Sequence, residues 1–114
     1  MNIINLVPHE IVLQDEEGTR YVYPPEPIPA RVSEDLERDK VYEEGIPVPI
    51  LSPVKYTAVV GLPDPQEGTI YIVSTIVAGQ CPRRDVFSPA TGPHDGAIRE
   101  GGNIIAVTHL RASI

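Results

Sequence analysis

Proline is the residue type that most limits what this chain can fold into. The sequence has 13 prolines among 114 residues, about twice the usual share of roughly 5%. Each proline fixes φ and removes a backbone N–H, so it ends helices and is confined to turns and to the edges of sheets. The prolines therefore predict short strands joined by stiff turns, and they argue against long helices.

Alternating apolar and β-branched residues predict the strands themselves. The clearest strand is Thr69–Ser74, and Val54–Val60 follows the same pattern. Residues 11–14 and 20–23 flank Asp15-Glu16-Glu17-Gly18, which predicts a hairpin with glycine in the tight turn. A second hairpin is expected where Arg99–Gly102 leads into residues 103–110, and we expect that last strand to be central.

The remaining segments give weaker predictions. Residues 28–32 are expected to form an edge strand because they contain Pro29, and Pro47 and Pro49 favour the same for residues 46–51. Ser33 is suited to cap one helical turn, and the charged run that follows it to Glu44 is expected to be a solvated loop. Residues 75–80 either continue the strand before them or form one or two helical turns that begin at Ser74.

Together these elements predict one domain over residues 1–114. Its fold class is mainly β, a small antiparallel barrel or sandwich with at most one or two short helices. The predicted core consists of Ile11, Leu13, Val59, Ile70, Ile72, Ile76, Ile105 and Val107.

Charge is unevenly distributed along the chain, which has a formal net charge of −7. Residues 1–68 hold thirteen acidic and five basic side chains, whereas residues 69–114 hold three and four. The acidic part disfavours nonspecific binding to nucleic acid and to anionic membranes, and the C-terminal part tolerates an anionic ligand. No apolar run approaches the length of about 18 residues that spans a membrane. The N-terminus does not read as a secretory signal, and the single Cys81 fits a reducing cytoplasm.

The loop over residues 81–93 holds the strongest candidates for a binding site. Arg83 and Arg84 can clamp a phosphate or carboxylate, although an internal pair with Asp85 explains them equally well. Thr91-Gly92-Pro93 can present a hydroxyl and a backbone N–H to an anion in a tight turn, and it is also a common structural turn.

Motifs for metals and cofactors are missing from the sequence. His9, His94 and His109 are scattered, and Cys81 has no partner at zinc-ligand spacing, so neither a metal nor a cofactor is expected. A Cys81–His94 nucleophile–base pair is conceivable, but the spacing does not favour it.

Several short motifs, taken together, resemble a small family of bacterial and bacteriophage proteins of about this length, over nearly the whole chain. The matching segments are Asn5-Leu6, Pro8-His9, Ala30-Arg31-Val32, 61–68 (GLPDPQEG), Tyr71-Ile72-Val73-Ser74, Val77-Ala78, Arg84-Asp85, Ser88-Pro89, Thr91-Gly92-Pro93 and residues 99–110. The chain departs from the family by its extra acidic residues around 34–44.

The resemblance implies a phage accessory protein that sequesters a nucleotide-like defence signal in the host cytoplasm without a reaction. The ligand is then a cyclic nucleotide or an ADP-ribose derivative, and a homo-oligomer is expected. Arg83, Arg84 and the Thr91-Gly92 turn would hold its phosphates, and Tyr71 or Phe87 would stack on its base. The predicted ligand site comprises Arg83, Arg84, Asp85, Phe87, Thr91, Gly92, Tyr71 and His94.

Two other classes of function remain open. One is a protein-interaction module that uses the acidic N-terminal half, in particular Asp35, Glu37, Glu43 and Glu44. The other is a small hydrolase or isomerase that uses Asp85, His94 or Cys81.

Overall fold

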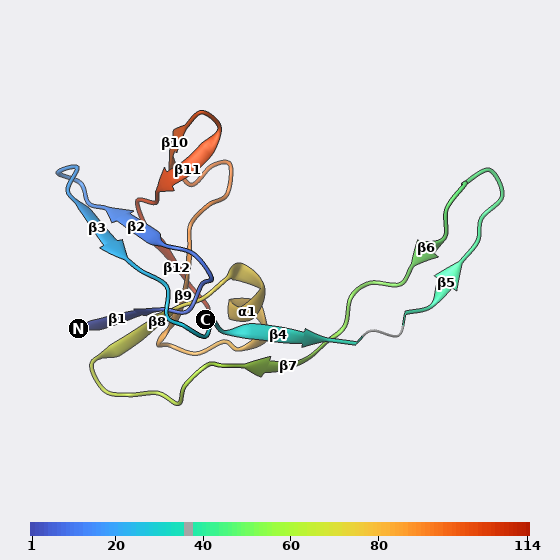
Figure 1. Cartoon of the computed structure of the whole chain (residues 1–114), viewed down its shortest axis with the longest axis horizontal. Helices are drawn as coiled ribbons and strands as arrows, with labels where there is room; N and C mark the ends of the chain where they lie inside the picture. Colours follow the sequence, from blue (N-terminus) through green and yellow to red (C-terminus); the bar gives the residue numbers. More distant parts are fainter. Residues whose placement is uncertain (36–37) are drawn as a thin grey trace.

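The computed structural model describes residues 1–35 and 38–114, and it shows a mainly β chain with one short helix (Figure 1). The elements are β1 (Asn2–Asn5), β2 (Ile11–Gln14), β3 (Arg20–Tyr23), β4 (Arg31–Glu34), β5 (Lys40–Val41), β6 (Ile50–Leu51), β7 (Tyr56–Val60), β8 (Thr69–Ile72), α1 (Thr75–Gln80), β9 (Val86–Pro89), β10 (Ile98–Glu100), β11 (Asn103–Ala106) and β12 (Leu110–Ala112). The prediction of a mainly β fold is confirmed. No sheet closes into a barrel within the described residues, and the strands form several small sheets.

A four-stranded mixed sheet with the order β1-β8-β9-β12 lies at the centre. β8 runs parallel to both β1 and β9, and β12 closes the edge antiparallel to β9. Parallel neighbours need a crossover between them, and α1 lies in the crossover from β8 to β9. The Ser74 hydroxyl caps α1 by accepting a hydrogen bond from the Val77 N–H at 3.3 Å. Of the two alternatives for residues 75–80, the helix is the one that forms.

The core lies on both faces of β8 because successive side chains of a strand point to opposite sides. Tyr71 and Val73 pack with Val77 of α1 on one face. Ile72 packs with Ile11 and other apolar side chains on the opposite face. Tyr71, Ile72 and Val73 are completely buried.

Three two-stranded ribbons surround this sheet. β2–β3 and β10–β11 are the two predicted hairpins, and both are confirmed. The second turn works because Gly101 and Gly102 have φ of 58° and 84°, which other residues rarely adopt. The third ribbon pairs β4 with β7 and packs against α1.

A fourth ribbon, β5–β6, belongs to an extension over residues 38–55 that we call the arm. It leaves the β4–β7 ribbon and reaches away from the rest of the molecule, which we call the body (Figure 1). Residues 39–51 are all exposed. The radius of gyration is 17.3 Å, whereas a compact domain of this length has a radius of about 13 Å. The arm therefore makes the molecule elongated.

Two sequence predictions about these elements are wrong. Ser33 lies inside β4 and does not cap a helix; residues 36 and 37 of that predicted helical turn lie outside the described residues. The last strand is not central, since β11 ends at Ala106 and, within residues 1–35 and 38–114, forms a ladder only with β10. The central place belongs to β8, whose apolar side chains suit burial on two faces, whereas β11 exposes Asn103 and Ile104.

The predicted core is partly correct. Ile11, Ile72 and Val107 are buried, but Ile76 is 51% exposed because α1 turns Val77 and Ala78 toward the sheet instead. The other four predicted residues, Leu13, Val59, Ile70 and Ile105, are partly buried.

Candidate functional site

Arg83 is engaged in an internal ion pair. Its Nε and Nη2 donate to the two carboxylate oxygens of Asp85 at 2.9 and 2.6 Å, and its Nη1 donates to the Pro63 carbonyl at 3.0 Å. The guanidinium carbon lies 6.0 Å from the centroid of the buried Tyr71 ring. Arg83 thus ties its own loop to the turn over residues 61–68, and Tyr71 has no exposed face for a base.

The same contact fixes the chemistry of Asp85. The hydrogen bond from Arg83 lowers the pKa of the Asp85 carboxyl, and the hydrogen bond to Asp85 raises the pKa of Arg83. A carboxylate with a lowered pKa is a weak proton acceptor at neutral pH. The geometry therefore gives Asp85 a structural role in the loop.

The Thr91-Gly92-Pro93 turn binds an anion that belongs to the chain itself. The Gly92 N–H donates to Asp95 Oδ2 at 2.7 Å, and Arg111 Nη2 donates to the same oxygen at 2.6 Å. These two hydrogen bonds, the Arg111 bond first, lower the pKa of Asp95. A Cβ on Gly92 would stand 2.8 Å from Asp95 Oδ2, so a side chain there would displace the Asp95 carboxylate from this contact. Of the two groups that the sequence suggested for an anion, the Gly92 N–H is engaged by Asp95 and the Thr91 hydroxyl is not.

The structure does not gather the predicted site residues around one hollow. Arg83 and Arg84 precede β9, and Thr91 and Gly92 follow it; a four-residue strand is about 13 Å long. Arg84 and His94 are exposed, and neither has a hydrogen bond or ion pair to any residue that the structure describes. Phe87 is partly buried within β9.

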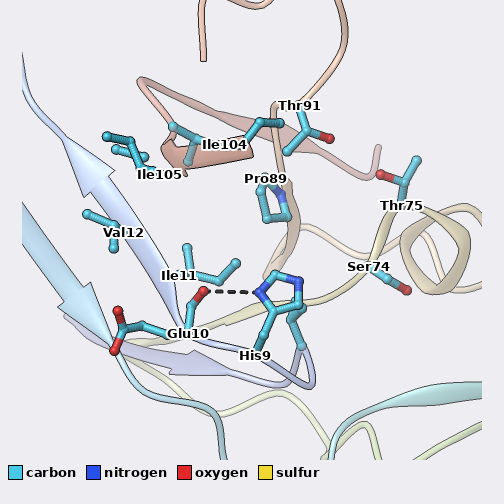
Figure 2. Close-up of a pocket in the computed structure, with 13 residues that line it drawn as sticks. His9, Glu10, Ile11, Val12, Ser74, Thr75, Pro89, Thr91, Ile104 and Ile105 are labelled. Carbon is cyan, nitrogen blue, oxygen red and sulfur yellow. Dashed lines mark hydrogen bonds between the residues drawn. The ribbon is translucent and has the colours of Figure 1, made fainter. Parts of the chain in front are cut away.

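A cavity of about 410 Å³ lies between β2, β11, the end of β9 and the start of α1 (Figure 2). It is lined by Val7, His9, Glu10, Ile11, Val12, Ser74, Thr75, Pro89, Thr91, Ile104, Ile105, Ala106 and Val107. Its volume is within the range of roughly 300–1,000 Å³ that small-molecule sites occupy.

The wall of this cavity is apolar and its rim is polar. Val7, Ile11 and Val107 are buried in the wall, and His9, Thr75 and Thr91 are exposed. No hydrogen bond to another described residue engages the Thr75 or Thr91 hydroxyl, whereas the Ser74 hydroxyl already caps α1. Two hydroxyls are therefore available to a ligand.

His9 has a defined orientation at the rim. Its Nδ1 lies 3.0 Å from the carbonyl oxygen of Glu10 (Figure 2). A carbonyl only accepts, so Nδ1 carries the hydrogen in this contact, and Nε2 of the neutral ring is a free acceptor. The ring stands in the cavity with Nε2 on the side away from Glu10.

A buried asparagine positions the His9 loop. The Asn5 amide nitrogen donates to the carbonyl oxygens of His9 and Tyr23, both at 2.9 Å, and Asn5 Oδ1 accepts from the Val7 N–H at 2.9 Å. Asn5 is only 2% exposed, so these bonds are shielded from water. The His9 side chain takes no part in these hydrogen bonds, so the backbone of residue 9 is held in place independently of the imidazole.

The sequence singled out Thr91 as part of a site at the arginine loop, whereas Thr91 lines this cavity; His9 and Thr75, which also line it, were not predicted as site residues. In the sequence, His9 is one of three scattered histidines and part of the Pro8-His9 segment of the resemblance, and neither observation marks it as a site residue. Residues 9, 75 and 91 are far apart in the sequence and follow no motif. They come together only in the fold, through the β8–α1–β9 crossover and the contact of β11 with β2. The one available signal was Pro8-His9, a rigid turn that holds a histidine directly before a strand.

Within the described residues, no helix has the length and apolar character needed to cross a membrane. Comparison of the chain with protein-family models, with curated proteins and with solved structures finds no match.

Proposed function

We propose that this protein binds a small molecule without transforming it, and that the cavity is the binding site. The observation that carries the proposal is an apolar hollow whose lining includes His9 and two threonines with hydroxyls that no described residue engages. A mostly apolar cavity with a few convergent polar groups is the common form of a ligand site.

The lining favours a flat, uncharged ring over an anion. Glu10 lines the cavity, and the lining contains neither lysine nor arginine. A phosphate placed inside would meet a like charge without a cation to pair with. A nucleobase suits the site better, because its faces are apolar and its edge can donate to His9 Nε2 and to the threonine hydroxyls. For a nucleotide-like ligand, the base then lies inside and the phosphates remain in solvent.

The resemblance to bacteriophage proteins agrees with this site. His9, Ser74, Pro89 and Thr91 all belong to the motifs on which that resemblance rests, and all line the cavity. Capture of a nucleotide-like signal is the biological role that follows, and it requires affinity but no reaction.

The residues suggested for catalysis lie elsewhere, which supports a binding function. Asp85, His94 and Cys81 do not line the cavity, and Asp85 is held in its pair with Arg83. The hydrolase or isomerase alternative therefore has no observation in its favour.

A thermal-shift titration with nucleosides, their monophosphates, cyclic dinucleotides and ADP-ribose tests the proposal. Ligand at a hundredfold its Kd stabilises the fold by about 2.7 kcal/mol, which raises the melting temperature measurably. We expect a nucleoside to bind at least as tightly as its monophosphate, and each ligand to be recovered unchanged.

Matched variants locate the binding. His9→Ala and Thr91→Val should weaken it at least about tenfold, as expected when a hydrogen bond of about 1.4 kcal/mol is lost. Arg84→Ala is the control and should bind like the parent chain. Loss of binding in Arg84→Ala with normal binding in Thr91→Val would move the ligand to the arginine loop and refute the cavity as the site.

A further inference from the structure

The arm carries large apolar side chains that the fold leaves in solvent. Six of them are between 44% and 75% exposed: Val41, Tyr42, Ile46, Val48, Ile50 and Leu51. Apolar side chains gathered on one projecting segment mark an interaction surface more often than a solvated loop.

The arm has little structure of its own to keep it ordered. β5 and β6 contain two residues each, and among the described residues they pair only with one another. Reciprocal hydrogen bonds between Asp39 and Ser52 close the base of the hairpin, at 2.9 and 3.1 Å. An isolated two-stranded hairpin is marginally stable in water, so a surface that covers this one would stabilise it.

Charge on the arm is arranged by position. Glu43 and Glu44 lie at the tip, and the cations Arg38, Lys40 and Lys55 lie near the base together with the acids Glu34, Asp35 and Asp39. Residues 38–55 thus carry equal numbers of acidic and basic side chains, whereas the whole chain has a net charge of −7. Among the described residues Arg38 approaches Glu34 at 3.7 Å, and Lys40 has no ion-pair partner.

We propose that the arms of two copies of this chain lie side by side in antiparallel orientation, related by a twofold axis. This arrangement places the tip acids of one copy beside the base cations of the other, and it does so twice. A hollow of about 280 Å³ at the base, lined by Asp35, Arg38, Lys40 and Leu51, lies where the partner tip arrives. We choose a second copy as the partner because each arm carries both the acids at its tip and the cations at its base that the pairing requires.

The apolar area fits a dimer of moderate strength. A fully exposed aliphatic side chain presents roughly 60–120 Å² of apolar area. Six half-exposed side chains then contribute about 200–400 Å² per arm, or about 400–800 Å² for two. Backbone and charged side chains bring the total toward the lower limit of about 1,200 Å² for stable interfaces, which favours a Kd near the micromolar range.

Sedimentation equilibrium of the full chain with reciprocal charge changes tests this pairing. The parent chain should dimerise, and Lys40→Glu alone or Glu43→Lys with Glu44→Lys should raise the Kd about tenfold or more. A chain with all three changes should regain the dimer. An equimolar mixture of the two weakened variants should form a heterodimer, because each tip then meets an opposite charge at the other base.

Glu16→Lys with Glu17→Lys is the matched control, since it makes the same charge change in the β2–β3 turn. It should leave the Kd of dimerisation within about threefold of the parent value, because surface charges far from an interface contribute little. The proposal is overturned by a parent chain that stays monomeric up to about 100 µM, well above a micromolar Kd. A dimer that ignores the arm changes, or that the control weakens equally, also overturns it.

Discussion

β8 and β6 contain similar apolar residues, but β8 is buried and β6 is exposed to solvent. Ile72 in β8 is completely buried, whereas Ile50 in β6 is 44% exposed. β8 pairs with strands on both sides and packs against apolar side chains on both faces, whereas the one described strand that pairs with β6 is β5. Residue type predicts that both segments are extended, and the neighbours that the fold supplies decide which one is buried. The body is therefore held by its own core, and we expect the arm to be held by a partner.

Removing the same side chain from each strand should show the largest difference. Ile72→Ala is expected to lower the free energy of unfolding by about 2–4 kcal/mol through lost burial and a cavity. Ile50→Ala should change it by less than about 0.5 kcal/mol. Urea denaturation at a concentration below dimerisation measures both. Equal losses would mean that the arm is part of the cooperative core.

Two glycines with positive φ provide a second comparison. Gly61, at the body end of β7, has φ of 83°, and a Cβ there would lie 2.9 Å from the Pro29 carbonyl oxygen. Gly45, at the arm tip, has φ of 85° and open space around it. We expect Gly61→Ala to cost about 2 kcal/mol in unfolding free energy from strain and collision. Gly45→Ala should leave the thermal midpoint of the body unchanged, because its strain is confined to the arm.

The sequence predicted local elements better than it predicted their pairing. Both hairpins could be predicted from their turn residues, Asp15–Gly18 and the glycine pair at 101–102, because the conformation of a turn depends on a few consecutive residues. The parallel pairing of β1 with β8 joins segments far apart in the chain, and no turn encodes it. Ile76 was predicted to lie in the core, but residues 75–80 form a helix that turns Val77 and Ala78 toward the sheet and leaves Ile76 exposed.

The candidate site shows the same limit at the level of chemistry. Arg83 and Gly92 were predicted to bind a negative group, and each binds a carboxylate that lies two or three residues further along the chain. Residue types reveal the affinity for an anion but do not distinguish an internal carboxylate from a ligand. The cavity was missed because its polar groups come from three distant segments.

A third comparison removes the charge from a carboxylate inside the body, Asp85, and from one on the arm, Glu43. Asp85→Asn removes the negative charge and replaces one of the two oxygens that accept hydrogen bonds from Arg83 with an NH2 group, which cannot accept one. We expect a loss of about 1–2 kcal/mol in unfolding free energy, moderated by partial exposure to solvent. Glu43→Gln is the control and should be neutral for stability in the monomer. If Asp85→Asn leaves the free energy of unfolding unchanged, the loop is fixed by its backbone contacts instead.

Acid should produce the smallest of these effects, and only in the body. Both Asp85 and Asp95 have lowered pKa values in the folded chain. A lowered folded pKa contributes stability above the unfolded pKa of about 3.9, and this contribution is lost as pH falls through the folded value. The urea midpoint should therefore stay level near neutrality and decline below about pH 4. In the variant with Asp85→Asn and Asp95→Asn, the urea midpoint should fall less steeply below about pH 4 than in the parent chain. An equally steep fall would contradict the stabilising role given to these two carboxylates.

Amide hydrogen exchange measured at several protein concentrations tests the difference between body and arm most directly. The account predicts that the amides of Tyr71, Ile72 and Val73 are protected at every concentration, because the core of the body is complete in one chain. The amides of the arm should exchange quickly in dilute protein and slow as the concentration rises through the Kd of the dimer. Arm amides that are protected in dilute protein as strongly as those of β8, or that exchange quickly at all concentrations, would contradict it.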